Sequence, residues 1–209
     1  MSESRLTDRD RIVIQEIDRW RACLGRHIRV LADFSGQRAC DRRLHKLIEL
    51  GLIERRRIIY GCPGVYRNTY RAKAIVPDIN PADKVRIEHL THDIVVIDTA
   101  IYINQRDGIQ FKEIMTEKQL HSQDGFGVRR HRPDFIYQQD NKSICVEVEL
   151  TLKAKDKLIK NIKDNFLTYD RQLWIVPSMQ SKITHILENN RVNYPNIEIL
   201  EVSEVQKHD

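Results

Sequence analysis

The sequence lacks any uninterrupted apolar run close to the roughly 20 residues that a membrane span requires. Its first ten residues, MSESRLTDRD, also lack the apolar segment of a signal peptide. Its four cysteines form no CxxC pair and have no histidine partners at zinc-finger spacing. The cysteine pattern excludes a disulfide framework and a zinc-finger site, and it favours cysteines that are buried free thiols. We expect a cytoplasmic protein with no membrane partner.

Positive charge is unevenly distributed along the 209 residues. Residues 1–75 contain 17 Lys and Arg against 9 Asp and Glu, whereas the remainder contains 18 against 21. A basic, arginine-rich module suits contacts with phosphate groups, but a mildly acidic one is not by itself a polyanion-binding surface. The apolar content of 41% suffices for a buried core. The composition therefore predicts an ordered chain whose two halves have different roles.

The basic half is predicted to begin with three helices. Thr7 is a typical residue to precede the first, the second covers residues 28–34, and Gly51 ends the third, residues 37–50. The buried stripe of the third helix is predicted to contain Ala39, Leu44, Leu47 and Ile48. Its other face carries polar and basic side chains that can reach phosphates and base edges when a helix enters the major groove: Gln37, Arg38, Asp41, Arg42, His45 and Lys46.

A hairpin with arginines on both arms is predicted to follow. Residues 52–60 are extended, residues 61–64 form the turn, and residues 65–72 form the return strand. The string RRLHKLIELGLIERRR resembles winged-helix proteins, which implies a winged helix-turn-helix DNA-binding domain over residues 1–76. The predicted DNA-binding residues are Arg38, Arg42, Arg43, His45, Lys46, Arg55, Arg56, Arg57, Arg67 and Arg71. A winged helix used only for protein contacts is the alternative.

The second half is predicted to be an α/β domain over residues 84–209, after a linker marked by Pro77 and Pro81. The spacing of apolar residues predicts a helix over 85–103, a strand over 109–115 and a later helix over 154–167 that buries Leu158, Ile159, Ile162 and Phe166. A parallel strand over 173–177, a helix over 180–190 and a strand over 197–202 complete the order.

Three carboxylates are predicted to meet at one end of a hairpin in this half. Two β-prone runs flank Asp140-Asn141, which is suited to a two-residue turn. Counting outward from that turn puts Asp134 directly opposite Glu147, with Cβ atoms about 5 Å apart. Glu149 follows two residues later and is expected on the same face. A solvated acidic strand face is the alternative interpretation.

Carboxylates gathered in this way repel one another unless a cation lies among them. Mg²⁺ or Mn²⁺ held by such residues, with water positions left open, can polarise a phosphate and activate an attacking water. Lys153, just past the second strand, is near enough in sequence to stabilise the developing charge. The predicted site is therefore a divalent-metal site for phosphodiester chemistry.

Pro133-Asp134, followed a dozen residues later by Glu147-Val148-Glu149, resembles the PD-(D/E)XK nuclease core, in which an Asp begins one strand and an acid-x-Lys motif lies on its hairpin partner. Glu149 stands where that family has lysine. With the winged helix and with Glu88-His89-Leu90 and Thr116-Glu117-Lys118, the chain is similar to the replication-relaxation family and to MobC-type plasmid relaxases. The fold implied is a winged helix followed by a restriction-endonuclease-like α/β domain.

This resemblance implies a metal-dependent DNA nickase or relaxase of plasmid mobilisation, conjugation or replication, with the winged helix choosing the origin site. The catalytic residues implied are Asp134, Glu147, Glu149 and Lys153, and the metal ligands implied are Asp134, Glu147, Glu149 and Glu117. Tyr169 as a covalent nucleophile is an open but less favoured idea. The alternatives are a DNA-binding regulator or mobilisation accessory factor with an inactive nuclease-like domain, and a restriction-type nuclease. Double-stranded DNA is the expected partner, and other mobilisation or replication proteins are further candidates. The oligomeric state is open, and a dimer is one of the alternatives.

Overall fold

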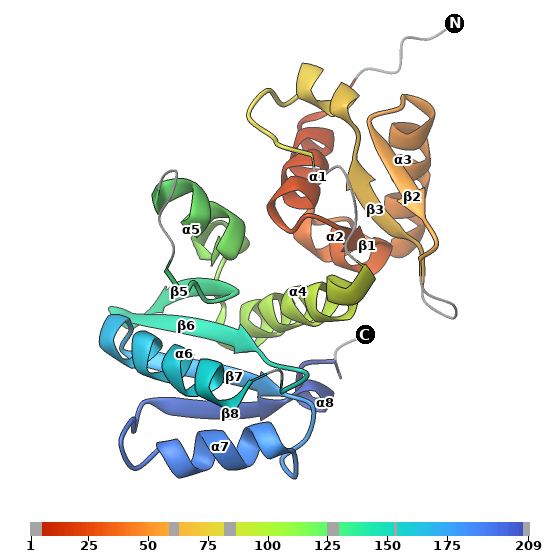
Figure 1. Ribbon diagram of the computed structural model, residues 1–209. Coiled ribbons are helices and arrows are strands. Elements are labelled where there is room, and N and C mark those ends of the chain that lie inside the picture. Colours follow the sequence, from red (N-terminus) through yellow and green to blue (C-terminus); the bar gives the residue numbers. More distant parts are fainter. Residues whose placement is uncertain (1–5, 59–62, 82–86, 125–129, 153, 207–209) are drawn as a thin grey trace, which may run out of the picture. The chain divides into compact units, whose positions relative to one another are not determined.

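The computed structural model describes residues 6–58, 63–81, 87–124, 130–152 and 154–206 (Figure 1). Within these ranges the chain is a mixed α/β protein. It divides into two compact units, residues 1–97 and 98–209, and each contains a β-sheet of its own. No described helix combines the length and the apolar character that crossing a membrane requires.

The first helix, α1 (Asp8–Arg19), begins directly after Thr7, as predicted. The backbone N–H of Thr7 donates to the Asp10 carboxylate over 2.5 Å, and the Thr7 hydroxyl donates to the same oxygen over 2.9 Å. These bonds satisfy a donor near the helix start and fix Asp10 in the first turn. Further along, Ile14 and Ile17 are completely buried and attach α1 to the core of the first unit.

Two further helices complete the predicted trio. α2 (Gly25–Leu31) begins and ends three residues earlier than predicted, whereas α3 (Gln37–Glu49) closely matches its predicted range. Gly51 has φ of 69°, and its N–H donates to the carbonyl oxygen of Ile48 over 2.8 Å. Because that left-handed conformation favours glycine, the end of α3 was already readable in the sequence.

The sheet of the first unit has the strand order β1-β3-β2, with both pairings antiparallel. Its strands are β1 (Cys23–Leu24), β2 (Ile53–Arg56) and β3 (Val65–Asn68). β2 and β3 form the predicted hairpin, whose turn lies partly outside the described residues. The return strand is shorter than predicted because the Thr69 hydroxyl donates to the Gly51 carbonyl oxygen over 2.6 Å and the chain then forms the 3₁₀ helix η1 (Tyr70–Ala74).

The division between the two units falls inside α4 (Ile87–Asp107), beyond the proline-marked linker. Leu90, near the start of this helix, is buried in one cluster with Ala22, Leu24 and Val65. This burial attaches the first turns of α4 to the first unit, so the compact unit extends past the linker that the sequence suggests.

The segment after α4 differs from the prediction of a strand over 109–115. The 3₁₀ helix η2 (Phe111–Glu113) comes first, and only Met115–Thr116 forms a strand, β4. The Glu113 carboxylate accepts the N–H of Gln110 over 2.9 Å, which favours a helical turn over an extended chain. α5 (Glu117–Asp124) then follows β4 directly.

The sheet of the second unit has the order β4-β5-β6-β7-β8. Its first hairpin pairs β5 (Phe135–Gln139) with β6 (Lys142–Val148) in the predicted register. The turn residues Asp140 and Asn141 have φ of 50° and 60°, the left-handed conformations that a two-residue type I′ turn requires. This part of the prediction is confirmed.

The remaining strands are parallel, as expected for this α/β layer. β7 (Arg171–Val176) pairs with β6, and β8 (Ile197–Glu201) pairs with β7. α6 (Lys155–Thr168) and α7 (Lys182–Asn190) pack on the same apolar cluster of β7 and β8 (Figure 1). The short helix α8 (Val202–Val205) follows β8. The predicted order of hairpin, helix, strand, helix and strand is confirmed.

Candidate functional site

The solvent-facing side of α3 carries most of the basic residues that the sequence predicts for it. Arg38, Arg42 and His45 are exposed, while Leu44 and Leu47 on the opposite side are completely buried. Neither Arg38 nor Arg42 has an ion pair within the described ranges. Their guanidinium groups are therefore available for an anionic partner.

Near the C-terminus of α3, the basic side chains of the exposed face already have a partner within the helix. His45 Nε2 lies 3.4 Å from Glu49, and Lys46 Nζ lies 3.1 Å from the same carboxylate. The Lys46 contact holds the pKa of Glu49 below its usual value. These are exposed pairs of the kind that contribute little to stability, so both side chains can exchange Glu49 for another partner.

Arg43 occupies a different position from its neighbour Arg42. Its Nε donates to Asp10 over 2.5 Å, and its Nη2 donates to the other oxygen of the same carboxylate. The Asp10 side chain is completely buried. Burial alone would raise the pKa of Asp10, but the bonds from Arg43 and Thr7 outweigh it and the net pKa is lowered. The side chain predicted to reach DNA thus joins α3 to α1.

The hairpin arginines fall into two groups. Arg56 and Arg67 both donate to Glu54, and the guanidinium carbon of Arg55 lies 5.6 Å from the centre of the Tyr66 ring. The rest are exposed and have no ion pair in the part of the chain that the structure describes: Arg57 and Arg71. Exposed cationic groups without an ion pair in the described ranges are therefore found both on α3 and next to the hairpin strands.

Asp134 and Glu147 lie at the open end of the β5–β6 hairpin. Phe135 pairs with Val146, so Asp134 and Glu147 are the next residues outward on the two strands. The N–H of Asp134 donates to the Val146 carbonyl oxygen over 3.1 Å, and its carboxylate accepts the N–H of Val148 over 2.7 Å. Two of the predicted carboxylates are therefore neighbours at the sheet end.

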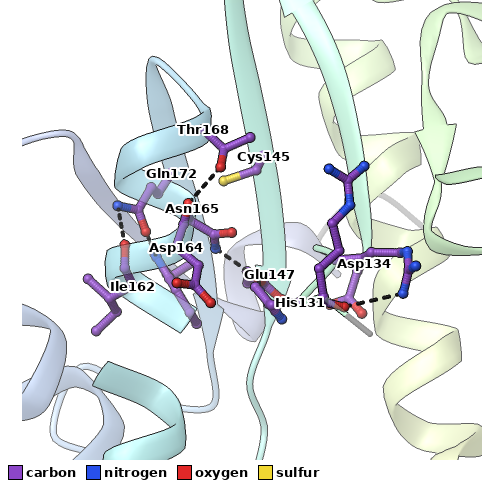
Figure 2. A network of polar contacts seen from close by, with 12 residues as sticks. His131, Asp134, Cys145, Glu147, Ile162, Asp164, Asn165, Thr168 and Gln172 are labelled. Atoms are coloured by element: carbon purple, nitrogen blue, oxygen red, sulfur yellow. Dashed lines mark hydrogen bonds and ion pairs between the residues drawn. The ribbon is translucent and has the colours of Figure 1, made fainter. Parts of the chain in front are cut away.

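Glu147 is buried, with 8% of its surface exposed, and it is bound through one oxygen. Its Oε1 accepts from His131 Nε2 over 2.5 Å and from Asn165 Nδ2 over 2.9 Å. Figure 2 shows Asn165 reaching Glu147 from α6, with His131 beside the carboxylate. In the part of the chain that is described, Oε2 accepts no hydrogen bond. One carboxylate oxygen is thus fixed and the other remains open.

The electrostatics of this pair follow from burial and from nearby acids. Burial raises the pKa of Glu147, the charge of Asp134 raises it further, and the bonds from His131 and Asn165 only partly oppose this. Burial lowers the pKa of His131, but the hydrogen bond and charge of Glu147 outweigh burial and raise it overall. Both directions favour a proton held between Nε2 and Oε1.

The other predicted site residues are Glu149, Glu117 and Lys153. Glu149 is the first residue beyond β6, and its N–H donates to the Ile175 carbonyl oxygen over 3.0 Å. The N–H of Glu117 donates to the Asp134 carbonyl oxygen over 2.8 Å, which brings the start of α5 to the same sheet end. Lys153 lies outside the described residues. Among those described, no three His, Cys, Asp or Glu side chains form a group able to hold a metal ion.

His131 and Asn165 are the site residues that sequence reasoning missed. Asn165 is only 1% exposed and continues the buried stripe of Leu158 and Ile162, whereas Phe166, predicted to be buried, is 37% exposed. An asparagine at a buried helical position needs a polar partner, so its place in the stripe was an available signal. His131 comes three residues before Asp134, where no pattern distinguished it.

Tyr169, the open candidate for a covalent nucleophile, lies near this cluster. Burial raises its pKa to about 12, with Cys145 and Glu147 adding to the effect and Arg130 opposing it. A raised pKa disfavours the phenolate that would attack a phosphate. Tyr169 therefore stays the less favoured candidate for a nucleophile.

A scan of the sequence against models of known protein families finds no match, and a search of curated proteins also finds none.

Proposed function

We propose that this protein binds duplex DNA through residues 6–76, which we interpret as a winged helix-turn-helix of the predicted 1–76 domain. The exposed arginines of α3 and the arginine-bearing strands β2 and β3 support this proposal. Phosphate contacts provide most of the non-specific affinity of DNA-binding proteins, and exposed guanidinium groups suit them. We therefore place double-stranded DNA first among the partners.

We further propose that residues 84–209 form a restriction-endonuclease-like domain that nicks DNA at a plasmid or mobile-element origin. The observation that carries this proposal is the pairing of the strand after Asp134 with the strand that contains Glu147. The resemblance to the PD-(D/E)XK core rests on the same two positions. Membership of the replication-relaxation family and contacts with other mobilisation proteins belong to this proposal.

Asp134 and Glu147 are the carboxylates that would hold Mg²⁺ or Mn²⁺. The open Oε2 of Glu147 and the repulsion between the two acids fit a hard cation, which prefers carboxylate oxygens. When bound, such an ion supplies polarisation of a phosphate and activation of a water. The chain itself contributes the fixed strand end, the hydrogen bond from Val148 to Asp134, and the buried surroundings of Glu147.

A DNA-binding regulator or mobilisation accessory factor is the second candidate. Two observations favour it: Glu149 replaces the lysine of the family motif, and Glu147 already accepts two protein hydrogen bonds. In this case the second unit would serve partner binding or dimerisation.

Plasmid topology distinguishes these candidates. We expect the full chain to convert a supercoiled plasmid that carries its origin into the open-circular form when Mg²⁺ or Mn²⁺ is added, and not in the presence of a chelator. A linear product would instead indicate a restriction-type nuclease. An unchanged supercoiled band with every metal, while a separate gel-shift assay still shows DNA binding, would reject nicking and leave the regulator.

A further inference from the structure

The hydrogen bonds to Glu147 are asymmetric. The imidazole of His131 and the amide of Asn165 both donate to Oε1, although a carboxylate can accept on either oxygen. The two donors come from separate parts of the chain, since Asn165 lies on α6 and His131 precedes β5. Two independent elements therefore restrain the same atom.

We propose that His131 and Asn165 are positioning residues that hold the Glu147 carboxylate so that Oε2 can bind a divalent cation. This inference rests on the proposed metal-dependent function and deepens it, because it adds two residues outside the set that the sequence predicts. Partners that orient a metal ligand in this way are known to affect metal affinity strongly.

Burial explains why such restraint is effective at Glu147. The side chain of His131 is 15% exposed and that of Glu147 is 11% exposed, so water competes little for their bond. Asn165 is 1% exposed and cannot turn toward solvent without leaving the apolar stripe of α6. A carboxylate whose Oε1 is held by two groups has few alternative rotamers, and an ion that binds it need not order it first.

Asp134 is the next residue outward from the Phe135–Val146 pair, opposite Glu147, so a cation on Oε2 would have a second carboxylate beside it. The hydrogen bonds of His131 and Asn165 offset the burial of Oε1 and leave Oε2 without a hydrogen bond among the described residues. A bound divalent ion would use Oε2, whereas a purely structural role for the network does not need Oε2 to stay open.

The test is Mn²⁺ binding by the full chain, measured by calorimetry without DNA. We expect Asn165→Leu, which removes the donor but keeps a similar volume, to weaken Mn²⁺ binding roughly 10- to 100-fold. His131→Phe should do the same, and His131→Gln, which retains a donor, should recover much of the affinity. The matched control is Asn190→Ala, which removes an amide of the same unit that donates to the Ile186 carbonyl oxygen.

Circular dichroism without metal establishes whether each variant is folded. If the variant at one of the two positions, 131 or 165, does not fold, the folded variant at the other position provides the test. Wild-type Mn²⁺ affinity in folded Asn165→Leu or His131→Phe protein would overturn the positioning role alone. Absence of Mn²⁺ binding by the wild-type chain would overturn the positioning role together with the metal-dependent function. An equal loss in Asn190→Ala would mean that general destabilisation causes the effect, and would also overturn the inference.

Discussion

Asp134→Asn is expected to lower the rate of metal-dependent plasmid nicking by about 1000-fold. A catalytic ion stabilises the transition state by several kcal/mol, which corresponds to this factor. The substitution removes the negative charge, but its amide oxygen can still accept the N–H of Val148, which is 2.7 Å from the carboxylate in the wild type. The β5–β6 pairing should therefore persist, and a quantified gel of open-circular product over time measures the effect.

Asp140→Asn is the matched control for this experiment. It removes the same charge from the same hairpin, but at the exposed turn rather than at the sheet end. Asparagine tolerates the left-handed conformation there, so nicking should be unchanged. Equal rates for Asp134→Asn and wild type would show that this carboxylate takes no part in the reaction.

Arg43→Ala is expected to destabilise the protein by about 3 kcal/mol, the scale for removing one partner of a buried ion pair. The variant leaves the Asp10 carboxylate buried with Thr7 as its remaining donor among the contacts described above. Arg42→Ala, one position earlier and exposed, should change stability by less than about 0.5 kcal/mol. Urea denaturation of both variants measures the difference.

The Arg43 effect should also depend on pH. The folded-state pKa of Asp10 is lowered, so its contribution to stability is present above the unfolded value and is lost as pH falls through the folded value. Acidification should therefore reduce the stability gap between wild type and Arg43→Ala. A gap that stays constant from neutral pH down to acid unfolding would argue against the ion pair.

Local chemistry accounts for what the sequence could predict. Gly51 ends α3 because its φ is positive, and Asp140-Asn141 forms the two-residue turn for the same reason. Once the turn is fixed, the register that sets Asp134 beside Glu147 follows by counting. These features depend only on residues close together in the chain, so the hairpin and its carboxylate pair could be anticipated.

Tertiary contacts account for most of what could not be predicted. Arg43 and Asp10 are 33 residues apart, and only the packing of α3 on α1 reveals that this arginine faces inward. Asn165 and Glu147 are 18 residues apart, and their bond depends on how α6 rotates against β6. The prediction of a strand over 109–115 was wrong for a local reason, because the Glu113 carboxylate caps η2. Residue type alone did not separate Arg42 from Arg43.

DNA binding by the exposed face of α3 is the central claim, and its salt dependence tests it most directly. A labelled duplex of arbitrary sequence is titrated with wild type, with Arg38→Ala/Arg42→Ala, and with Lys112→Ala/Lys182→Ala, which removes two exposed cations of the second unit. Each lost phosphate contact lowers the slope of log K against log salt by about 0.9, so the arginine variant should lose about two units and the lysine variant none. An unchanged slope and affinity in the folded arginine variant would contradict the account.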